Sequence, residues 1–231
     1  MAETQSWFVF PRWANFLLPL LLIFAIGGSL YVPVLFGFGA SPLTKDAGYA
    51  PVQPVPYSHA LHVGQLGLDC RYCHTGVEKA AFANLPATQT CMNCHTNIRV
   101  DSPKLLPIRN SMKTGKPVEW VKIHDLPDYA YFNHSAHVNH GVGCVTCHGQ
   151  VDRMDVVRQV APLSMGWCLD CHRAPEKFLR PKDQVTNLHW KPEIKGNETL
   201  AEAQLRQGLE LKAQYKIHGQ QYMQSCSTCH R

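Results

Sequence analysis

The stretch Cys144-Val-Thr-Cys147-His148 decides the class of this sequence, because the same pattern occurs five times. Each copy has two cysteines separated by two residues and a histidine directly after the second cysteine. Together the copies use all ten cysteines of the chain, which are Cys70, Cys73, Cys91, Cys94, Cys144, Cys147, Cys168, Cys171, Cys226 and Cys229. The histidines that follow them are His74, His95, His148, His172 and His230.

This C-x-x-C-H pattern is the attachment signature of c-type haem. Two thiols at this spacing can form thioethers with the two vinyl groups of one porphyrin, and the next imidazole can bind the iron as its proximal ligand. Zinc sites and disulfides also use paired cysteines, but neither requires a histidine after each pair. The sequence therefore predicts five covalently bound haems c, and an exported chain, because the thioethers form outside the cytoplasm.

The charges of the chain do not indicate a nucleic-acid partner. Lys and Arg number 22 and Asp and Glu 17, a net charge of +5, but the basic residues are scattered along the chain. The chain has no block of five or six basic residues, which is typical of basic tails that bind nucleic acid. The two propionates of each haem would add roughly −10 in total and reverse the sign of the net charge.

The N-terminal part, residues 1–40, predicts a retained membrane anchor with a helix over about 13–36. No charged residue lies between Trp13 and Thr44, and about 20 apolar residues cross a bilayer. A cleaved signal peptide has a shorter apolar region and a small-residue cleavage site, for which Gly37–Ser41 is the nearest substitute. Trp7, Trp13 and Tyr31 suit the membrane interface.

The basic residue Arg12 on the short N-terminal side predicts a cytoplasmic N-terminus. We therefore expect a single-pass protein of the bacterial inner membrane, with the haem region on the periplasmic side. Residues 41–58 contain four prolines and predict an extended linker.

The haem region, residues 59–231, contains an internal repeat. His59-Ala-Leu-His62 precedes Cys70 by 11 residues and Cys91 by 32, counted from the first histidine, and His134-Ser-Ala-His137 precedes Cys144 by 10 and Cys168 by 34. This similarity predicts two di-haem modules, at 59–95 and 134–172, and a C-terminal haem at 226–230.

The fold class follows from how little chain serves each haem. Residues 59–231 must hold five haems, and this length is too short to build a separate apolar core around each porphyrin. The porphyrins should therefore form much of the core. We predict a multihaem cytochrome c of loops and short α-helices, with one N-terminal transmembrane helix. Asn197 predicts the N-cap of a longer packing helix over 198–212.

The distal iron ligands are predicted from the H-x-x-H pairs. In similar small multihaem cytochromes the first histidine of such a pair binds the haem that follows, and the second reaches another haem. The distal ligands expected on this basis are His59, His62, His134 and His137.

The fifth distal ligand is left open by the sequence. Met165 lies three residues before Cys168, where the first module has Thr88 before Cys91. A methionine ligand would raise the potential of its haem, and we expect that haem to be the one held by Cys168 and Cys171. The alternatives are His124, His189 and His218.

Longer runs around these motifs resemble the pentahaem cytochrome subunit of bacterial alternative complex III. They are His59-Ala-Leu-His-Val-Gly-Gln-Leu-Gly-Leu-Asp-Cys-Arg-Tyr-Cys-His74, Thr88-Gln-Thr-Cys-Met-Asn-Cys-His95, Ile123-His-Asp-Leu-Pro-Asp-Tyr-Ala-Tyr-Phe-Asn-His134 and Leu163-Ser-Met-Gly-Trp-Cys-Leu-Asp-Cys-His-Arg173. The resemblance covers nearly the whole chain, the anchor included. It implies an electron-transfer subunit, without catalytic residues of its own, that relays electrons from menaquinol to a periplasmic acceptor. It also implies an iron–sulfur subunit, quinol-binding polytopic membrane subunits and a monohaem cytochrome c as partners.

Two other function classes compete with this one. A free-standing membrane-anchored quinol dehydrogenase cytochrome usually carries four haems. A multihaem reductase needs an iron with an open position, whereas the surplus of histidines and methionines here predicts five six-coordinate irons.

Overall fold

The computed structural model describes residues 11, 13–39 and 46–230, and the chain divides into two units, Met1–Lys45 and Asp46–Arg231. Trp7 and Arg12, on which part of the expected topology depends, lie outside the described residues. Each unit is described separately below.

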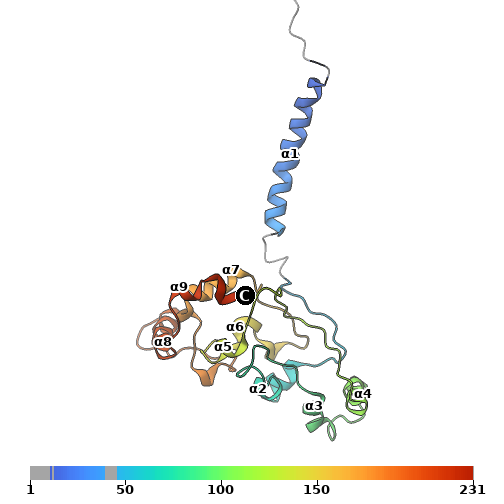
Figure 1. Ribbon diagram of the computed structural model, residues 1–231. Coiled ribbons are helices and arrows are strands. Elements are labelled where there is room, and N and C mark those ends of the chain that lie inside the picture. Colours follow the sequence, from blue (N-terminus) through green and yellow to red (C-terminus); the bar gives the residue numbers. More distant parts are fainter. Residues whose placement is uncertain (1–10, 12, 40–45, 231) are drawn as a thin grey trace, which may run out of the picture. The chain divides into compact units, whose positions relative to one another are not determined.

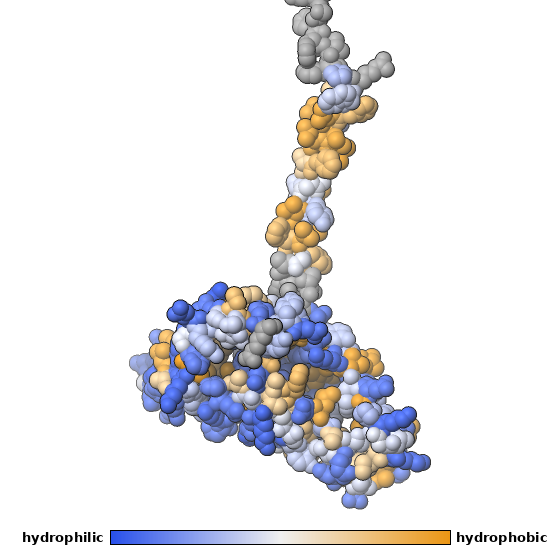
Figure 2. Space-filling model, in the orientation of Figure 1, coloured by the Kyte–Doolittle hydropathy of each residue, from blue (hydrophilic) through white to orange (hydrophobic). Residues whose placement is uncertain are grey.

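The described part of the first unit is the helix α1, Ala14–Gly39. It continues through Pro19 and Pro33, and none of its residues is buried. Apolar side chains cover much of its visible surface (Figure 2). By length and composition α1 could cross a membrane. A signal sequence near an N-terminus has the same properties, so the retained anchor stays a prediction.

The second unit consists of short helices joined by loops, and its described residues contain no strand, only an isolated bridge between Val142 and Leu179. The helices α2, α5 and α6 lie centrally, with α3 and α4 towards one end and α7, α8 and α9 towards the other (Figure 1). The α-helices are α2 Cys70–Cys73, α3 Thr88–His95, α4 Leu106–Thr114, α5 His134–Val138, α6 Cys144–His148, α7 Met165–Arg173, α8 Leu200–Gln214, α9 Gln220–Met223 and α10 Cys226–Cys229. The π-helix η2 is Ala60–Gln65, and the 3-10 helices are η3 Pro103–Leu105, η4 Val151–Arg153, η5 Pro175–Lys177 and η6 Lys182–Gln184.

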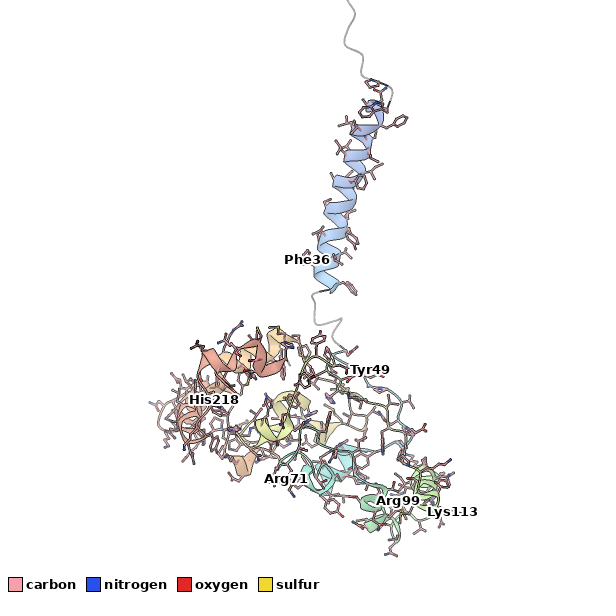
Figure 3. The ribbon with its side chains drawn as sticks, viewed as in Figure 1. Phe36, Tyr49, Arg71, Arg99, Lys113 and His218 are labelled. Carbon is pink, nitrogen blue, oxygen red and sulfur yellow. The ribbon has the colours of Figure 1, made fainter. Side chains whose placement is uncertain are left out.

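The second unit is elongated. Arg99 and Lys113 lie at the end of α3 and α4, His218 lies at the opposite end, and Arg71 lies between them (Figure 3). Hydrophilic residues cover much of the visible surface of this unit (Figure 2).

The apolar core of the second unit is small. One buried cluster contains Val77, Val138 and Val185, with Ala83 packed against it. Among the large side chains described, Leu179 and Val185 are fully buried. A unit of this length normally buries a larger apolar core. Eight of the ten cysteines are half-buried, and the small size of the core fits the expectation that bound groups complete it.

The longest helix of the second unit is α8, and its N-cap differs from the expected one. Thr199 caps the helix instead of Asn197, because Thr199 and Glu202 form a reciprocal capping box. The hydroxyl of Thr199 accepts a hydrogen bond from the backbone N–H of Glu202 (3.3 Å), and the Glu202 carboxylate accepts one from the backbone N–H of Thr199 (2.7 Å). Gly208 lets α8 approach η5 closely, since a Cβ atom there would lie 1.8 Å from the carbonyl oxygen of Glu176.

Candidate functional site

The five C-x-x-C-H motifs all form helical turns. They occupy α2, the C-terminal part of α3, α6, the C-terminal half of α7, and α10. Residues three apart lie on one face of a helix, so both thiols of each motif point to the same side. Side chains cap two of these helices: Asp69 accepts a hydrogen bond from the N–H of Arg71 (2.8 Å), and Ser164 accepts one from that of Trp167 (3.3 Å). None of the ten thiols is in a disulfide.

The motif histidines are oriented by hydrogen bonds at Nδ1. In four of them this nitrogen donates to a main-chain carbonyl oxygen, which leaves Nε2 free for a metal. These bonds join His74 to Asn84 (2.8 Å), His95 to Ile98 (3.0 Å), His172 to Met223 (2.8 Å) and His230 to Tyr129 (2.9 Å).

The fifth motif histidine, His148, has a different partner. Its Nδ1 lies 3.3 Å from Nε2 of His124, and the two rings are nearly perpendicular, with an interplanar angle of 75°. Burial lowers the pKa of His148 to about 3, with His124 and His134 adding to the effect. Burial also lowers the pKa of His124. Both rings are therefore neutral near pH 7, as imidazole ligands and their acceptors must be.

Three motif histidines each face a second imidazole from a distant segment. The ring centres are 6.2 Å apart for His62 and His95, 6.4 Å for His134 and His148, and 6.2 Å for His137 and His172. A metal–nitrogen bond is about 2.0 Å long, so two imidazoles on opposite sides of one iron have ring centres roughly 6 Å apart. The residues present thus fit an iron between the rings of each pair.

A fourth histidine pair involves His59 and His74. Burial lowers the pKa of His59 to about 4, and the neighbouring His74 and His62 lower it further. The Nδ1 atom of His59 is buried without a hydrogen-bond partner among the described residues. The first histidine of each H-x-x-H pair therefore lies near the next motif along the chain, and the second lies near the motif after it, as expected. Iron binding by these residues stays a prediction.

The internal repeat also includes an aromatic residue before each H-x-x-H pair, which was not recognised from the sequence. Tyr57 contacts the ring of His59 edge-on (centroids 4.8 Å apart) and stacks on that of His62 (4.3 Å). Phe132 contacts His134 and His137 in the same way, at 4.8 and 4.5 Å. The signal was present in the sequence, because each aromatic residue lies two positions before the first histidine of its pair.

Cysteines of different motifs lie close enough to affect one another. The thiols of Cys70 and Cys144 are neighbours: Cys144 raises the pKa of Cys70, and Cys70 lowers the pKa of Cys144. Burial raises the pKa of Cys147 to about 12, and Cys171 of the next motif adds to the rise. The further neighbouring pairs are Cys73 with Cys91, and Cys168 with Cys229. These electrostatic neighbours indicate the order of the motifs as α3, α2, α6, α7 and α10.

The structure does not support Met165 opposite His172. Met165 begins α7 and lies seven residues, two helical turns, before His172, so both side chains lie on one face of the helix. The ring that faces His172 is that of His137. Met165 is 63% exposed, and it lies one turn before Cys168, which neighbours Cys229.

The alternative fifth ligands have other contacts. The Nε2 atom of His124 faces His148, and that of His189 lies 2.5 Å from the Asp152 carboxylate. His218 packs against Tyr222, with ring centroids 4.2 Å apart. No second imidazole is placed opposite His230 by a contact among the described residues.

The comparisons with known proteins agree with a haem-binding chain. No family model matches the sequence. Over 122 residues the chain is 35% identical to the multihaem cytochrome c subunit of menaquinone reductase from Nitratidesulfovibrio vulgaris. The aligned part covers 52% of this chain and 56% of the relative, so the chain spans little more than half of the relative's length. About half of the chain is thus similar to a protein named as a multihaem cytochrome c subunit.

Proposed function

We propose that this protein is the electron-transfer subunit of a membrane quinol oxidoreductase and carries five covalently attached haems c. The observation that carries this proposal is the set of three imidazole pairs with ring centres 6.2–6.4 Å apart, each containing the histidine of a C-x-x-C-H motif. Bound haem iron would supply one-electron chemistry at each site.

In this proposal the chain acts by attaching and orienting its cofactors. The motif cysteines are the attachment residues, and the motif histidines are the proximal ligands. The distal ligands are His59, His62, His134 and His137, and Met165 is proposed for the site at His230. With every iron position filled by side chains, no site is left for a substrate, so the subunit has no catalytic residues of its own.

The order of the motifs supports a relay. The electrostatic neighbours among the cysteines indicate a single series of motifs, with the α3 motif at one end and the α10 motif at the other. In this series the two H-x-x-H modules meet at Cys70 and Cys144. A series of neighbouring attachment sites suits transfer from one partner protein to another, and the two ends are the proposed entry and exit.

For the location, we propose a single-pass protein of the bacterial inner membrane, anchored by α1 and with residues 59–231 on the periplasmic side. The Pro-rich residues 41–58 would be the linker. The length and apolar composition of α1 support the anchor, and the need to form thioethers outside the cytoplasm supports the side.

We assign the subunit more specifically to alternative complex III, with menaquinol as the electron donor. The sequence runs from His59 to Arg173 support it. Its partners would be an iron–sulfur subunit, quinol-binding polytopic membrane subunits and a monohaem cytochrome c. The name of the relative favours a second candidate, because that protein belongs to a menaquinone reductase, in which electrons flow towards the quinone.

Haem attachment is tested by removing one motif. The double variant Cys144→Ala/Cys147→Ala should lose one of five haems, measured by the pyridine haemochrome assay and by the intact mass of the subunit. Thr146→Ala, between the two cysteines, is the matched control and should keep all five. Equal haem content in both variants would refute attachment at this motif.

The direction of electron flow and the partners need the assembled complex. The tagged subunit is purified from native membranes in mild detergent, and its partners are identified by mass spectrometry. Reduction of its haems by a menaquinol analogue supports quinol oxidation, whereas formation of quinol from quinone by the prereduced complex supports the second candidate. Isolation of the subunit alone, active with quinol, would support the free-standing dehydrogenase.

A further inference from the structure

His148 differs from the other four motif histidines in the partner of its Nδ1 atom. The others donate to main-chain oxygens at 2.8–3.0 Å, whereas His148 faces the side chain of His124. The ring of His148 also has His134 as a neighbour, with ring centres 6.4 Å apart and an interplanar angle of 10°. His148 therefore has two histidine neighbours, and their distances indicate different tasks.

The geometry separates these two tasks. His134 has its Nδ1 bonded to the carbonyl oxygen of Ala81 (2.8 Å), so its Nε2 is free to bind an iron shared with His148. The ring centre of His124 is only 4.4 Å from that of His148, which is too close for an iron between them. Nε2 of His124 also points at the nitrogen of His148 that does not bind metal.

We propose that His124 is a positioning residue for His148: it accepts the Nδ1 proton of His148 and thereby tunes the site held by Cys144 and Cys147. This role depends on the proposed haem attachment and removes His124 from the candidates for the fifth iron ligand.

The chemical consequence follows from the basicity of the acceptor. An imidazole nitrogen is a stronger base than a peptide oxygen, and a hydrogen bond at Nδ1 makes the ligand nitrogen more basic. A more basic ligand stabilises ferric over ferrous iron, so His124 should lower the potential of this one site. Loss of the hydrogen-bond partner of a metal-binding histidine commonly lowers metal affinity or activity about tenfold or more. A tenfold change in the ferric-to-ferrous preference is about 59 mV for one electron.

The test uses the full membrane-anchored protein and two substitutions. His124→Phe keeps a ring at this position but has no acceptor nitrogen, and His124→Gln keeps an acceptor oxygen but cannot replace an imidazole ligand. His140→Ala is the control, because His140 is exposed and bonded within its own turn to the carbonyl oxygen of Ala136. The measurements are haem content, reaction with carbon monoxide, and a potentiometric titration of all haems.

The expected result is that His124→Phe keeps five six-coordinate haems and raises one of the five potentials, while His124→Gln returns part of that shift. A haem in either variant that becomes five-coordinate and binds carbon monoxide would make His124 an iron ligand and overturn the proposal. Unchanged potentials in His124→Phe would also overturn it. If the His124→Phe variant does not bind haem, the iron coordination in His124→Gln decides between the two roles. Six-coordinate haems support the positioning role, and a five-coordinate haem makes His124 an iron ligand. Absence of covalent haem from the wild-type protein would refute the proposed function itself.

Discussion

The imidazole of His62 faces that of His95 with 6.2 Å between the ring centres, although the two belong to different helical segments. His137 and His172 repeat this relationship at the same distance. In both cases the second histidine of an H-x-x-H pair reaches past the nearest motif to the following one. The duplication seen in the sequence is therefore also a duplication of side-chain geometry, and it leads to the following predictions.

Removal of His137 should open one iron position. His137→Ala is expected to convert one haem to a five-coordinate, high-spin form that binds carbon monoxide, because no other imidazole among the described residues faces His172. The absorption spectrum with and without carbon monoxide measures this. His140→Ala, three residues further along, should leave the spectrum unchanged. If carbon monoxide binds instead to Met165→Leu at the site of His172, the original assignment of Met165 is right.

Met165 should supply the sulfur ligand of the C-terminal site. Met165→Leu is expected to remove a His/Met signature from the near-infrared magnetic circular dichroism spectrum and to lower the highest potential, because thioether sulfur favours ferrous iron. Since Met165 is 63% exposed, the substitution should change the free energy of unfolding by less than about 0.5 kcal/mol. Met112→Leu, another exposed methionine, is the control. Five His/His signatures in the wild-type protein would contradict this prediction.

The aromatic residues before each H-x-x-H pair should be interchangeable. Phe132→Tyr and Tyr57→Phe each create the residue that the other module already has, so thermal unfolding should hardly change. Phe132→Ala removes the ring that packs on His134 and His137. Because this ring is only half-buried, we expect a loss of about 2 kcal/mol in unfolding free energy, below the 3–5 kcal/mol of a fully buried ring. Equal melting curves for Phe132→Ala and Phe132→Tyr would show that the ring does not hold the pair.

Asp69 should make the region around α2 sensitive to acid. The side chain of Arg71 donates hydrogen bonds that lower the pKa of Asp69 from 3.8 to about 2, and Thr186 adds another at 3.0 Å. Because the folded-state pKa is lowered, the stabilisation is complete above about pH 4 and disappears as the pH falls through 2. Since the pair is exposed, its size should be at most about 1 kcal/mol.

The measurement is the difference in unfolding free energy between the wild-type protein and Asp69→Asn as a function of pH. It should be constant at neutral pH and vanish near pH 2. Asp170→Asn is the control, because Asp170 lies 3.7 Å from Arg173 and is 72% exposed. A difference that grows as the pH falls would contradict the assigned direction of the pKa shift.

Local spacing in the sequence was sufficient for the features that depend on neighbouring residues. The C-x-x-C-H motifs were found from spacing alone, and the structure has a helical turn at each. The apolar run at 13–36 predicts the helix found at Ala14–Gly39. The repeat of His59 and His62 in His134 and His137 was also visible. The cap of α8 was misplaced by two residues, because the competing Thr199-x-x-Glu202 pattern forms two hydrogen bonds where Asn197 would form one.

Only the tertiary structure decided which distant rings meet. His124 and His134 both lie upstream of His148, and spacing does not distinguish an iron ligand from a hydrogen-bond acceptor. Packing places the ring centre of His134 6.4 Å and that of His124 4.4 Å from the ring centre of His148. Met165 likewise matched a ligand position by sequence, but the helix carries it on the same face as His172. The sequence by itself predicts how many attachment sites this chain has and of which kind, because covalent attachment needs only neighbouring residues. The partners across each site were decided by the fold, because the two rings come from segments that only packing brings together.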